Sequence, residues 1–578
     1  MSETLVTIHN VTKVFTPEQP PALADISGII PKGEIVGLVG PDGAGKTTLI
    51  RLIAGLLKPT EGFITVAGYD TVNNAEEVHY FTGYMPQKFG LYEDLTVIQN
   101  LNLYADLRGI VGEEKKAVFE RLLRFTGLAP FKNRLAGALS GGMKQKLGLA
   151  CALVKKPMLL LLDEPSVGVD PISRRELWKM VNDLLAEDIS VVWSTAYLDE
   201  AEKCHTVLLI NEGKLLFNGK PQDLTKRVEG RVFKISNIKV NRRELLRNIL
   251  RQENVVDGLV QGDDLRIVVK EKKTPILDLE QLKGHEEFQI KPIPPRFEDA
   301  FMDMLGGGGQ WKTSGLAATT LQIEGASEHI VEAQGLTKKF GSFTAADDIT
   351  FSIAKGEIFG LLGPNGAGKT TTFKMLCGLL QPTQGKALVK DFDLQKAPSN
   401  ARARIGYMAQ KFSLYGTLSV LQNLNFFARI YNLKGKEVGS AVSRMLVIFN
   451  LQNFHATPSE KLPLGFKQRL SLACATMHHP DVLFLDEPTS GVDPIARREF
   501  WNHINGLVEK GVTILVTTHF MDEAEYCDRI ALIYRGKIIQ MAAPDKLKEI
   551  AKSPQNPSPS LDDAFIKLIE EYDASHPL

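Results

Sequence analysis

The sequence predicts an α/β protein in which one domain occurs twice. The stretch GPDGAGKTT (Gly40–Thr48) returns as GPNGAGKTT (Gly363–Thr371), and each copy follows a short apolar strand and precedes a helical segment. A second pair of strands, LLLLDEP (Leu159–Pro165) and VLFLDEP (Val482–Pro488), ends in an acidic pair each time. A continuous apolar run without alternation is typical of a strand buried in a parallel sheet. Each copy is therefore expected to have a mostly parallel core sheet.

The register of the repeat is constant. Lys46 and Lys369 are 323 residues apart. The same separation relates further pairs: Gln87 and Gln410, Asp163 and Asp486, Glu164 and Glu487, Asp170 and Asp493. A repeat of this length is a whole domain and is much longer than a solenoid unit. The chain thus contains a duplicated domain with almost no insertions between its motifs.

The register changes after the first copy. The segment PRFEDAF (Pro295–Phe301) echoes PSLDDAF (Pro559–Phe565) at a separation of only 264, so 59 additional residues lie at roughly 230–292. Their pattern predicts a small α+β insertion with the following elements: strand 231–236, helix 243–251, hairpin 255–269, helix 276–282 and strand 288–291. This is the order of the ferredoxin-like motif. The insertion is interpreted either as a packed extension without a ligand or as a sensor domain.

The glycine-rich tract after the insertion predicts a flexible linker, because it is rich in Gly, Ser and Thr and has little periodicity. The predicted organisation is: first domain 1–229, α+β extension 230–305, linker 306–328, second domain 329–550, and a C-terminal helix and tail 551–578.

Composition limits the classes of function. Lys plus Arg and Asp plus Glu both number 68, which argues against a nucleic-acid binder that neutralises phosphates. No apolar run is long enough to span a bilayer, and the N-terminus lacks the pattern of a secretion signal. The five cysteines have no C-x-x-C spacing, which fits a reducing compartment. We therefore expect a cytoplasmic protein whose membrane association depends on partners.

The repeated glycine-rich segment has the pattern of a phosphate-binding loop. Its glycines allow backbone N–H groups to surround phosphates, and the helix that follows contributes its positive N-terminal end. The lysine would reach the β- and γ-phosphates, and the next threonine would place its hydroxyl on Mg²⁺. The predicted ATP contacts are Gly40, Gly43, Gly45, Lys46, Thr47 and Thr48 in the first copy, and Gly363, Gly366, Gly368, Lys369, Thr370 and Thr371 in the second.

The acidic pairs follow the second buried strand, where α/β sheets present their ligands. Asp163 and Asp486 are expected to hold Mg²⁺ together with Thr47 and Thr370. The neighbouring Glu164 and Glu487 are the predicted catalytic carboxylates, which orient or deprotonate the attacking water. The alternative, a solvated turn, is less favoured because the pair follows a phosphate loop in both copies.

Several further motifs resemble those of ATP-binding cassette (ABC) proteins. LSGGMKQK (Leu139–Lys146) resembles the family's signature, and SVGVD (Ser166–Asp170) resembles its D-loop. The resemblance implies P-loop domains with a helical and an antiparallel β subdomain beside the core sheet. It also implies a Mg²⁺ and water contact for Gln87 and Gln410, and adenine stacking for Phe15 and Phe340. A phenylalanine at either of these two positions could instead belong to the core.

In this family two domains pair head to tail, so that each ATP lies between one domain's phosphate loop and the other's signature. Ser140, Gly141 and Gly142 would then donate hydrogen bonds to the γ-phosphate. The second signature, LPLGFKQR, has Pro463 and Leu464 in place of Ser140 and Gly141.

A second departure concerns His519, which matches the family's catalytic switch histidine, whereas the first copy has Ala196 at that position. Head-to-tail pairing would bring Ala196, Pro463 and Leu464 into one impaired site. The other site would combine Lys369, Glu487 and His519 with the intact signature. The hypothesis is one hydrolysing site and one that mainly binds ATP.

The segments Phe89–Leu101 and Phe412–Leu424 resemble the membrane-subunit-facing segment of drug-, sodium- and nodulation-factor-type exporters. The resemblance implies an ATPase peripheral to the cytoplasmic face of the inner membrane, with two integral membrane subunits as partners, alike or different. Ordinary helix packing is the alternative for these segments. A tandem cassette protein that acts on the ribosome is the alternative function, although such proteins resemble one another in a charged helical linker that this chain lacks.

Overall fold

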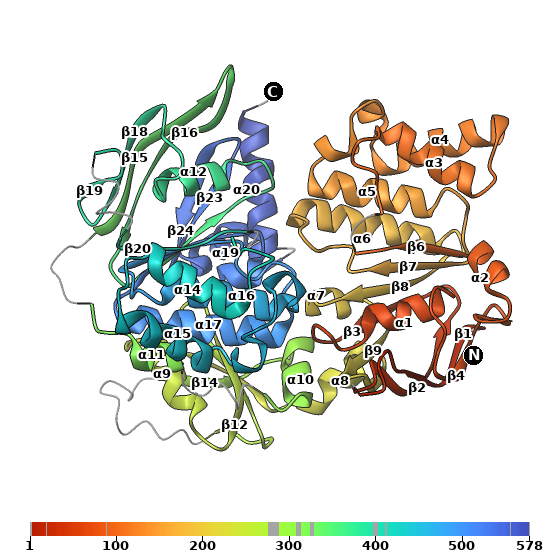
Figure 1. Cartoon of the computed structure of the whole chain (residues 1–578), viewed down its shortest axis with the longest axis horizontal. Coiled ribbons are helices and arrows are strands. Elements are labelled where there is room, and N and C mark those ends of the chain that lie inside the picture. The colour runs from red at the N-terminus through yellow and green to blue at the C-terminus, as the bar shows by residue number, and fades with distance from the viewer. Residues whose placement is uncertain are drawn as a thin grey trace. The chain divides into compact units, whose positions relative to one another are not determined.

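The computed structural model describes residues 3–18, 20–87, 90–275, 288–307, 314–323, 329–396, 403–410, 413–554 and 556–576 (Figure 1). The chain divides into two compact units and passes between them after Val228, after Pro295 and after Phe301, the last of these within helix α10 (Phe297–Met304). Unit 1 comprises Met1–Val228 and Arg296–Phe301; unit 2 comprises Glu229–Pro295 and Met302–Leu578. None of the described residues forms a helix that is long and apolar enough to span a membrane.

Unit 1 is built around a six-stranded sheet that is parallel except at one edge. Its order is β10 (Lys214–Gly219), β9 (Thr206–Asn211), β3 (Ile35–Val39), β8 (Ser190–Thr195), β7 (Leu159–Asp163) and β6 (Thr82–Met85). Only β9 and β10 pair antiparallel. Every residue of β3, β7 and β8 is buried, as the continuous apolar runs predict.

A second, antiparallel sheet of unit 1 has the order β2 (Leu23–Pro31), β1 (Thr4–Lys13), β4 (Glu61–Val66) and β5 (Tyr69–Asp70). One hydrophobic cluster joins this sheet to α1 and to the core sheet. The helices are α1 (Lys46–Ile53), α2 (Ala75–Phe81), α3 (Val97–Leu107), α4 (Gly112–Thr126), α5 (Gly141–Ala152), α6 (Pro171–Leu185), α7 (Leu198–Ala201) and α8 (Pro221–Thr225).

The second copy, in unit 2, repeats both sheets. Its core sheet has the order β20 (Ile405–Met408), β21 (Val482–Asp486), β22 (Thr513–Thr518), β17 (Ile358–Leu362), β23 (Arg529–Tyr534) and β24 (Lys537–Ala542). The antiparallel sheet is β16 (Phe343–Ala354), β15 (His329–Phe340), β18 (Gln384–Val389) and β19 (Phe392–Asp393). The predicted fold class is therefore confirmed in both copies.

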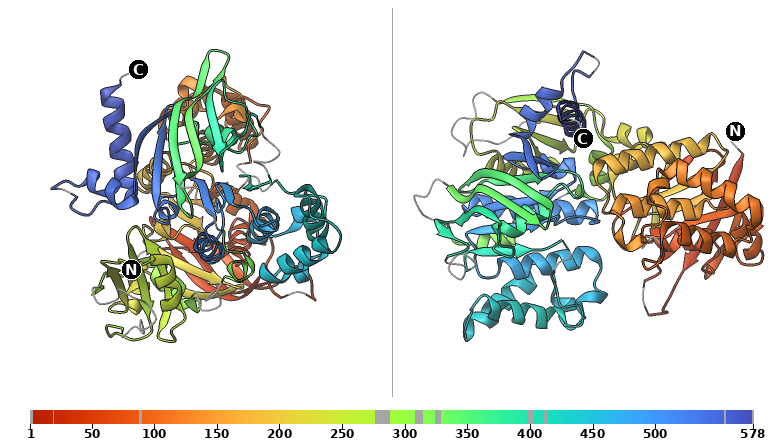
Figure 2. Two further views of the ribbon diagram at one scale, coloured as in Figure 1. Left: turned by 90° about the vertical axis from the view of Figure 1, so that its left-hand side faces the viewer. Right: turned by 90° about the horizontal axis from the view of Figure 1, so that it is seen from above.

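The helices of the second copy are α12 (Lys369–Leu376), α14 (Val420–Ile430), α15 (Lys436–Ile448), α16 (Leu464–Thr476), α17 (Pro494–Glu509), α18 (Met521–Ala524), α19 (Pro544–Ala551) and α20 (Leu561–Ser575). Figure 2 shows α14, α15 and α16 gathered at one side of this copy, apart from β15 and β16. These three helices form the helical subdomain.

The insertion contains β11 (Val232–Ser236), α9 (Arg242–Leu250), β12 (Val255–Gln261), β13 (Asp264–Val269) and β14 (Gln289–Pro292). Its sheet is wholly antiparallel with the order β12-β13-β11-β14, which is the ferredoxin-like order. The helix expected at 276–282 lies outside the described residues. Although the insertion follows the first copy in sequence, it belongs to unit 2.

Ion pairs hold the insertion against the second copy. Arg243 Nη2 lies 2.8 Å from Asp528 Oδ2, and Arg242 pairs with the same carboxylate. Arg498 Nη2 lies 3.1 Å from Asp257 Oδ2, and both side chains are almost fully buried. Separation of the insertion from the second copy would leave the two charges of this buried pair uncompensated. The pair therefore favours the packed arrangement.

Part of the expected flexible linker is ordered. Residues Gly315–Thr319 form the short helix α11, which packs on α17 and buries Leu316. Gly506 permits this packing, since a Cβ there would lie 2.7 Å from Ala317 Cβ. The composition pointed to flexibility, but a capping serine, Ser314, and one apolar residue are sufficient to dock this segment.

Candidate active site

The first glycine-rich segment forms a tight loop between β3 and α1. Gly45 has φ 108° and α1 begins at Lys46, so a left-handed residue turns the chain directly into the helix. Lys46 Nζ donates to the carbonyls of Gly40 at 2.7 Å and Pro41 at 3.1 Å. At Gly40 a Cβ would lie only 2.0 Å from Ile210 O, so the close approach of two backbones requires glycine.

The second copy reproduces this loop. Lys369 Nζ donates to Gly363 O at 2.6 Å and to Pro364 O at 3.1 Å. At Gly366, as at Gly43, a Cβ would meet no described atom within 4 Å, so the open side of each loop has room for a phosphate. Thr47 and Thr48, like Thr370 and Thr371, lie in the first turn of the following helix.

The aspartates at the ends of β7 and β21 lie beside these loops. Thr47 Oγ1 donates to Asp163 Oδ1 at 3.1 Å, and Asp163 Oδ2 is buried with no hydrogen-bond partner among the described residues. In the second copy Thr517 Oγ1 donates to Asp486 Oδ1 at 2.5 Å. Burial is the main influence on both carboxyls and raises their pKa values. A buried carboxylate with an open oxygen suits a divalent cation or the water bound to it.

The predicted catalytic carboxylate of the first copy, Glu164, has φ 51°, an uncommon conformation for a residue other than glycine. Gln87 Nε2 donates to Glu164 Oε2 at 2.5 Å. Lys46 Nζ lies 3.5 Å from Glu164 Oε1. The structure thus brings together the predicted loop lysine, the glutamine and the glutamate of this copy.

The second copy adds a histidine to this arrangement. Glu487 accepts from Gln410 Nε2 at 2.6 Å, and its Oε1 lies 3.3 Å from Nδ1 of the buried His519. Its backbone N–H donates to Thr517 Oγ1 at 3.0 Å. Burial raises the pKa of Glu487, but His519, the charge of Lys369 and the Gln410 hydrogen bond outweigh burial and lower the pKa to about 2. Glu487 is therefore ionised at neutral pH.

The first copy has no polar side chain at the histidine position. Ala196 follows β8 as His519 follows β22, and it is 1% exposed. The neighbouring Thr195 donates to the buried Glu200 at 2.6 Å, as the matching Thr518 donates to Glu523 at 2.7 Å, so the threonine does not replace the histidine. The two copies therefore differ at the point where a γ-phosphate partner is expected.

The signature helices also differ. Ser140 is the N-cap of α5 and its hydroxyl accepts from Met143 N at 3.3 Å. At Gly142 a Cβ would lie 2.5 Å from Ser173 Oγ, so this helix packs closely on α6. Its counterpart α16 begins after Pro463, which provides no side-chain cap, and Leu464 occupies the first helical position.

The two aromatic residues predicted to stack on adenine are exposed. Phe15 is 61% exposed and Phe340 is 51% exposed, which excludes the alternative that they belong to the core. Lys13 Nζ lies 5.2 Å from the ring of Phe15, and Lys338 Nζ lies 5.3 Å from that of Phe340. Adenine stacking itself stays a prediction.

One contributor was missed in the sequence. Thr517 fixes both Asp486 and the backbone of Glu487, although its strand β22 is far from them along the chain. The signal was the threonine pair in TTH, directly before the recognised histidine.

Comparison with known proteins identifies the family. The ABC transporter family model matches residues 23–167 and 346–490, about half of the chain. The probable multidrug ABC transporter ATP-binding protein YbhF of Escherichia coli is 56% identical over the full length of both chains. A putative ABC transporter ATP-binding protein of Methanosarcina acetivorans is 27% identical over 92% of this chain and 85% of its own. The Nod factor export ATP-binding protein I of Bradyrhizobium diazoefficiens is 39% identical over 38% of this chain and 72% of its own. Two phosphate loops, two acidic pairs and these matches show that the chain belongs to the ABC transporter family, as an ATP-binding protein that hydrolyses ATP.

Proposed function

We propose that this ATPase drives export through separate membrane subunits, with hydrolysis concentrated at the second copy's catalytic residues. The observation that carries the proposal is the arrangement of Glu487, which lies between Gln410 and His519. The corresponding Glu164 has the glutamine contact but faces no histidine. In this proposal the second copy would supply groups for both the water and the γ-phosphate, whereas the first copy would lack the histidine.

The chemistry follows from these contacts. With a pKa of about 2, Glu487 stays ionised and can accept a hydrogen bond from the attacking water. His519 would contact the γ-phosphate and Lys369 the β- and γ-phosphates, where charge develops during phosphoryl transfer. Asp486, Thr370 and Gln410 would hold Mg²⁺, as Asp163, Thr47 and Gln87 would in the first copy. The cation would neutralise phosphate charge.

The proposed pairing of the two copies is head to tail, as in the family. The intact signature, Ser140 to Gly142, would then complete the site of Glu487 and His519. Pro463 and Leu464 would face the site that contains Ala196, which would mainly bind ATP. The N-capping hydroxyl of Ser140 supports this assignment, because Pro463 has neither a hydroxyl nor an N–H to donate.

The direction of transport and the partner proteins are inferred from the names of relatives. The name of the Escherichia coli relative refers to a multidrug transporter, and that of the Bradyrhizobium diazoefficiens relative refers to export. We infer two integral membrane subunits, alike or different, with the chain peripheral on the cytoplasmic face of the inner membrane. The domain limits of the proposal are 1–229, 230–305, 306–328, 329–550 and 551–578. Residues 230–295 of the extension share a compact unit with the second ATPase domain, whereas Arg296–Phe301 belong to the other unit.

The experiment is purification of the tagged full-length chain from detergent-solubilised membranes, with Glu487→Gln to prolong the ATP-bound state. Co-purification of integral membrane proteins with the variant is the expected result, as is ATP-dependent transport after those proteins are reconstituted with the wild-type chain. Co-purification of ribosomes without membrane proteins would contradict the proposal and favour the alternative function. The control is the same preparation with Lys46→Ala and Lys369→Ala, which should weaken ATP binding at both loops.

A further inference from the structure

A cavity of about 210 Å³ lies in unit 2, away from both phosphate loops. It is lined by α9 of the insertion, α11 of the linker and the C-terminal half of α17, and it is open to solvent on one side. Leu246, Leu250 and Ala317 provide an apolar part of its wall. A volume of this size suits a small metabolite.

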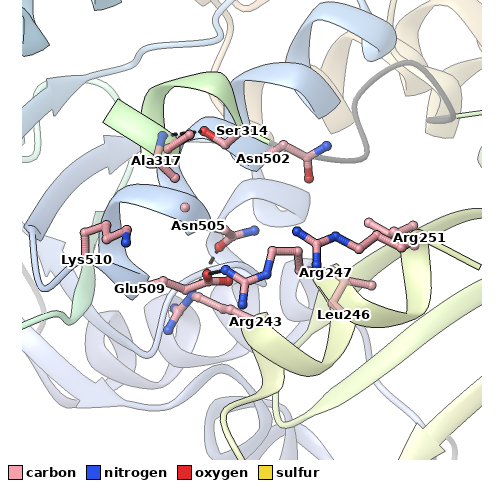
Figure 3. A pocket seen from close by; sticks show the side chains of 13 residues that line it. Arg243, Leu246, Arg247, Arg251, Ser314, Ala317, Asn502, Asn505, Glu509 and Lys510 are labelled. Carbon is pink, nitrogen blue, oxygen red and sulfur yellow. Dashed lines mark hydrogen bonds and ion pairs between the residues drawn. The ribbon is translucent and has the colours of Figure 1, made fainter. Parts of the chain in front are cut away.

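Basic side chains dominate the polar part of the wall. Arg243 and Arg247 lie on one face of α9, and Arg251, four residues further on, is the C-cap residue of this helix. Lys510 is the C-cap residue of α17. Like charges at this spacing on a helix repel one another. Figure 3 shows Arg247 and Arg251 extending from α9 toward Asn505 on α17.

The acidic residues nearby do not satisfy all of these cations. Arg243 pairs with Asp528, and Arg247 pairs with Glu509 and, at 3.5 Å, with Glu244. Yet Arg247 Nε is buried without a hydrogen-bond partner among the described residues. Among the residues that the structure describes, no ion pair or hydrogen bond involves the side chain of Arg251 or that of Lys510. Basic residues at helix C-termini are favourable in themselves, but that does not account for the buried, unsatisfied N–H of Arg247.

The first copy lacks this wall. The α17 residues that line the cavity are Asn502, Asn505, Gly506, Glu509 and Lys510, and those at the matching positions of α6 are Lys179, Asn182, Asp183, Ala186 and Glu187. The cationic Lys510 thus corresponds to an acidic residue, and Gly506, which admits α11, corresponds to an aspartate. The cavity is a feature of the second copy, and it depends on the insertion and the linker.

The cavity wall is connected to the catalytic part of the second copy. Ser314 Oγ, in the wall, lies 3.0 Å from His503 Nδ1 on α17. One turn earlier Glu499 accepts from Arg469 of α16, the second signature helix, at 2.5 Å. Asp493, which ends the D-loop, immediately precedes α17 as its N-cap residue. An occupant would therefore contact the helix that joins the insertion to the ATP site.

We propose that this cavity binds a small organic anion, a carboxylate or phosphate monoester on a compact apolar group. The guanidinium groups of Arg247 and Arg251 would hold the anionic group, because the planar fork of arginine matches carboxylate and phosphate oxygens. Asn505 offers a further polar contact, and the apolar residues accommodate the rest of the ligand. Binding would hold α9 and α11 against α17. Binding of the anion in this cavity is independent of transport and of the direction of transport.

The test is calorimetric titration of the full-length chain at low salt with phenyl phosphate, and with benzoate as the carboxylate probe. The protein carries Lys46→Ala and Lys369→Ala in every case, so that the phosphate loops do not compete for the anion. Binding of either probe, with no binding of benzylamine, is expected. Arg251→Ala should weaken binding about tenfold, the loss expected for one charge-assisted contact. Arg251→Lys should weaken it less.

Two further variants separate this result from misfolding or general charge effects. Ala318→Phe should abolish binding by filling the cavity from an exposed position of α11. Arg124→Ala removes an exposed arginine from the last turn of α4 in unit 1 and should leave binding unchanged. The parent protein carries only Lys46→Ala and Lys369→Ala. If it bound neither phenyl phosphate nor benzoate, the proposal would be overturned. Equal binding by the parent, Arg251→Ala and Ala318→Phe would also overturn it.

Discussion

Glu487 Oε1 lies 3.3 Å from His519 Nδ1, and the matching glutamate of the first copy has no such neighbour because Ala196 replaces the histidine. This contact distinguishes the two catalytic carboxylates within their own domains. Both have the glutamine contact, at 2.5 Å and 2.6 Å, and both lie beside a phosphate loop. One difference between the copies thus lies at the group expected to contact the γ-phosphate, and a second is Thr517, which contacts both Asp486 and the backbone of Glu487.

His519→Ala should lower the rate of ATP hydrolysis by about 10²–10³, the usual loss when one well-placed polar group is removed from such a site. The expected reason is loss of the γ-phosphate contact and of the positioning of Glu487. Steady-state ATPase assays at saturating ATP measure the effect. His455→Ala, at an exposed histidine of the same domain, is the control. An equal rate in both variants would contradict a role for His519.

Ser140→Asp should abolish most hydrolysis but keep the protein stable. Aspartate is as good an N-cap as serine, so α5 retains its cap, whereas its charge would repel the γ-phosphate. The matched variant Pro463→Asp introduces the same residue at the start of α16 and should retain most of the activity. ATPase assays combined with thermal unfolding check both expectations. Comparable losses in the two variants would refute the difference assigned to the signatures.

Glu523→Gln should flatten the dependence of stability on pH. Burial raises the pKa of Glu523 to about 7, despite the charge of Arg497 and the Thr518 hydrogen bond, whereas an unfolded glutamate titrates near ~4.3. Between these values the folded protein binds more protons than the unfolded chain. The free energy of unfolding therefore falls as the pH rises from about 4.3 to about 7.

Denaturant unfolding at several pH values measures this slope in the wild-type protein and in Glu523→Gln. The variant should lose part of the slope, and Glu549→Gln, at an exposed glutamate, should keep it. An unchanged slope in Glu523→Gln would show that this carboxyl titrates normally in the folded protein.

Asp257→Ala should destabilise unit 2 by about 3–5 kcal/mol, because it removes one partner of the buried Arg498–Asp257 pair. Asp263→Ala, which removes a 76% exposed carboxylate from a pair in the same insertion, should cost less than about 1 kcal/mol. Equilibrium unfolding monitored by tryptophan fluorescence gives both values. Similar costs would mean that the insertion is not held by the buried pair.

The sequence predicts the parts of the molecule that depend on local backbone requirements. Gly40 and Gly45 are predictable parts of the phosphate loop, because a Cβ at Gly40 would clash with Ile210 O and Gly45 has a φ of 108°. The buried strands before Asp163 and Asp486 were equally clear, since continuous apolar runs leave few alternatives. Comparison of the copies then identified the histidine position without a structure.

The remaining features depend on contacts between segments that are distant along the chain. The insertion packs on the second ATPase domain because Arg242 and Arg243 pair with Asp528, and nothing local indicates that pairing. The docking of α11 on α17 depends on the small Gly506, and composition alone indicated only a flexible tract. Thr517 acquires its role only when β22 lies beside β21.

The central claim is that the two catalytic glutamates contribute unequally, and the most direct measurement compares ATP hydrolysis by Glu487→Gln and Glu164→Gln in the full-length chain. Both substitutions keep the size of the side chain and remove its charge. The account predicts that Glu487→Gln removes most of the activity, whereas Glu164→Gln retains most of it. Loss of activity in Glu164→Gln with most activity retained in Glu487→Gln, or equal loss in both, would contradict it.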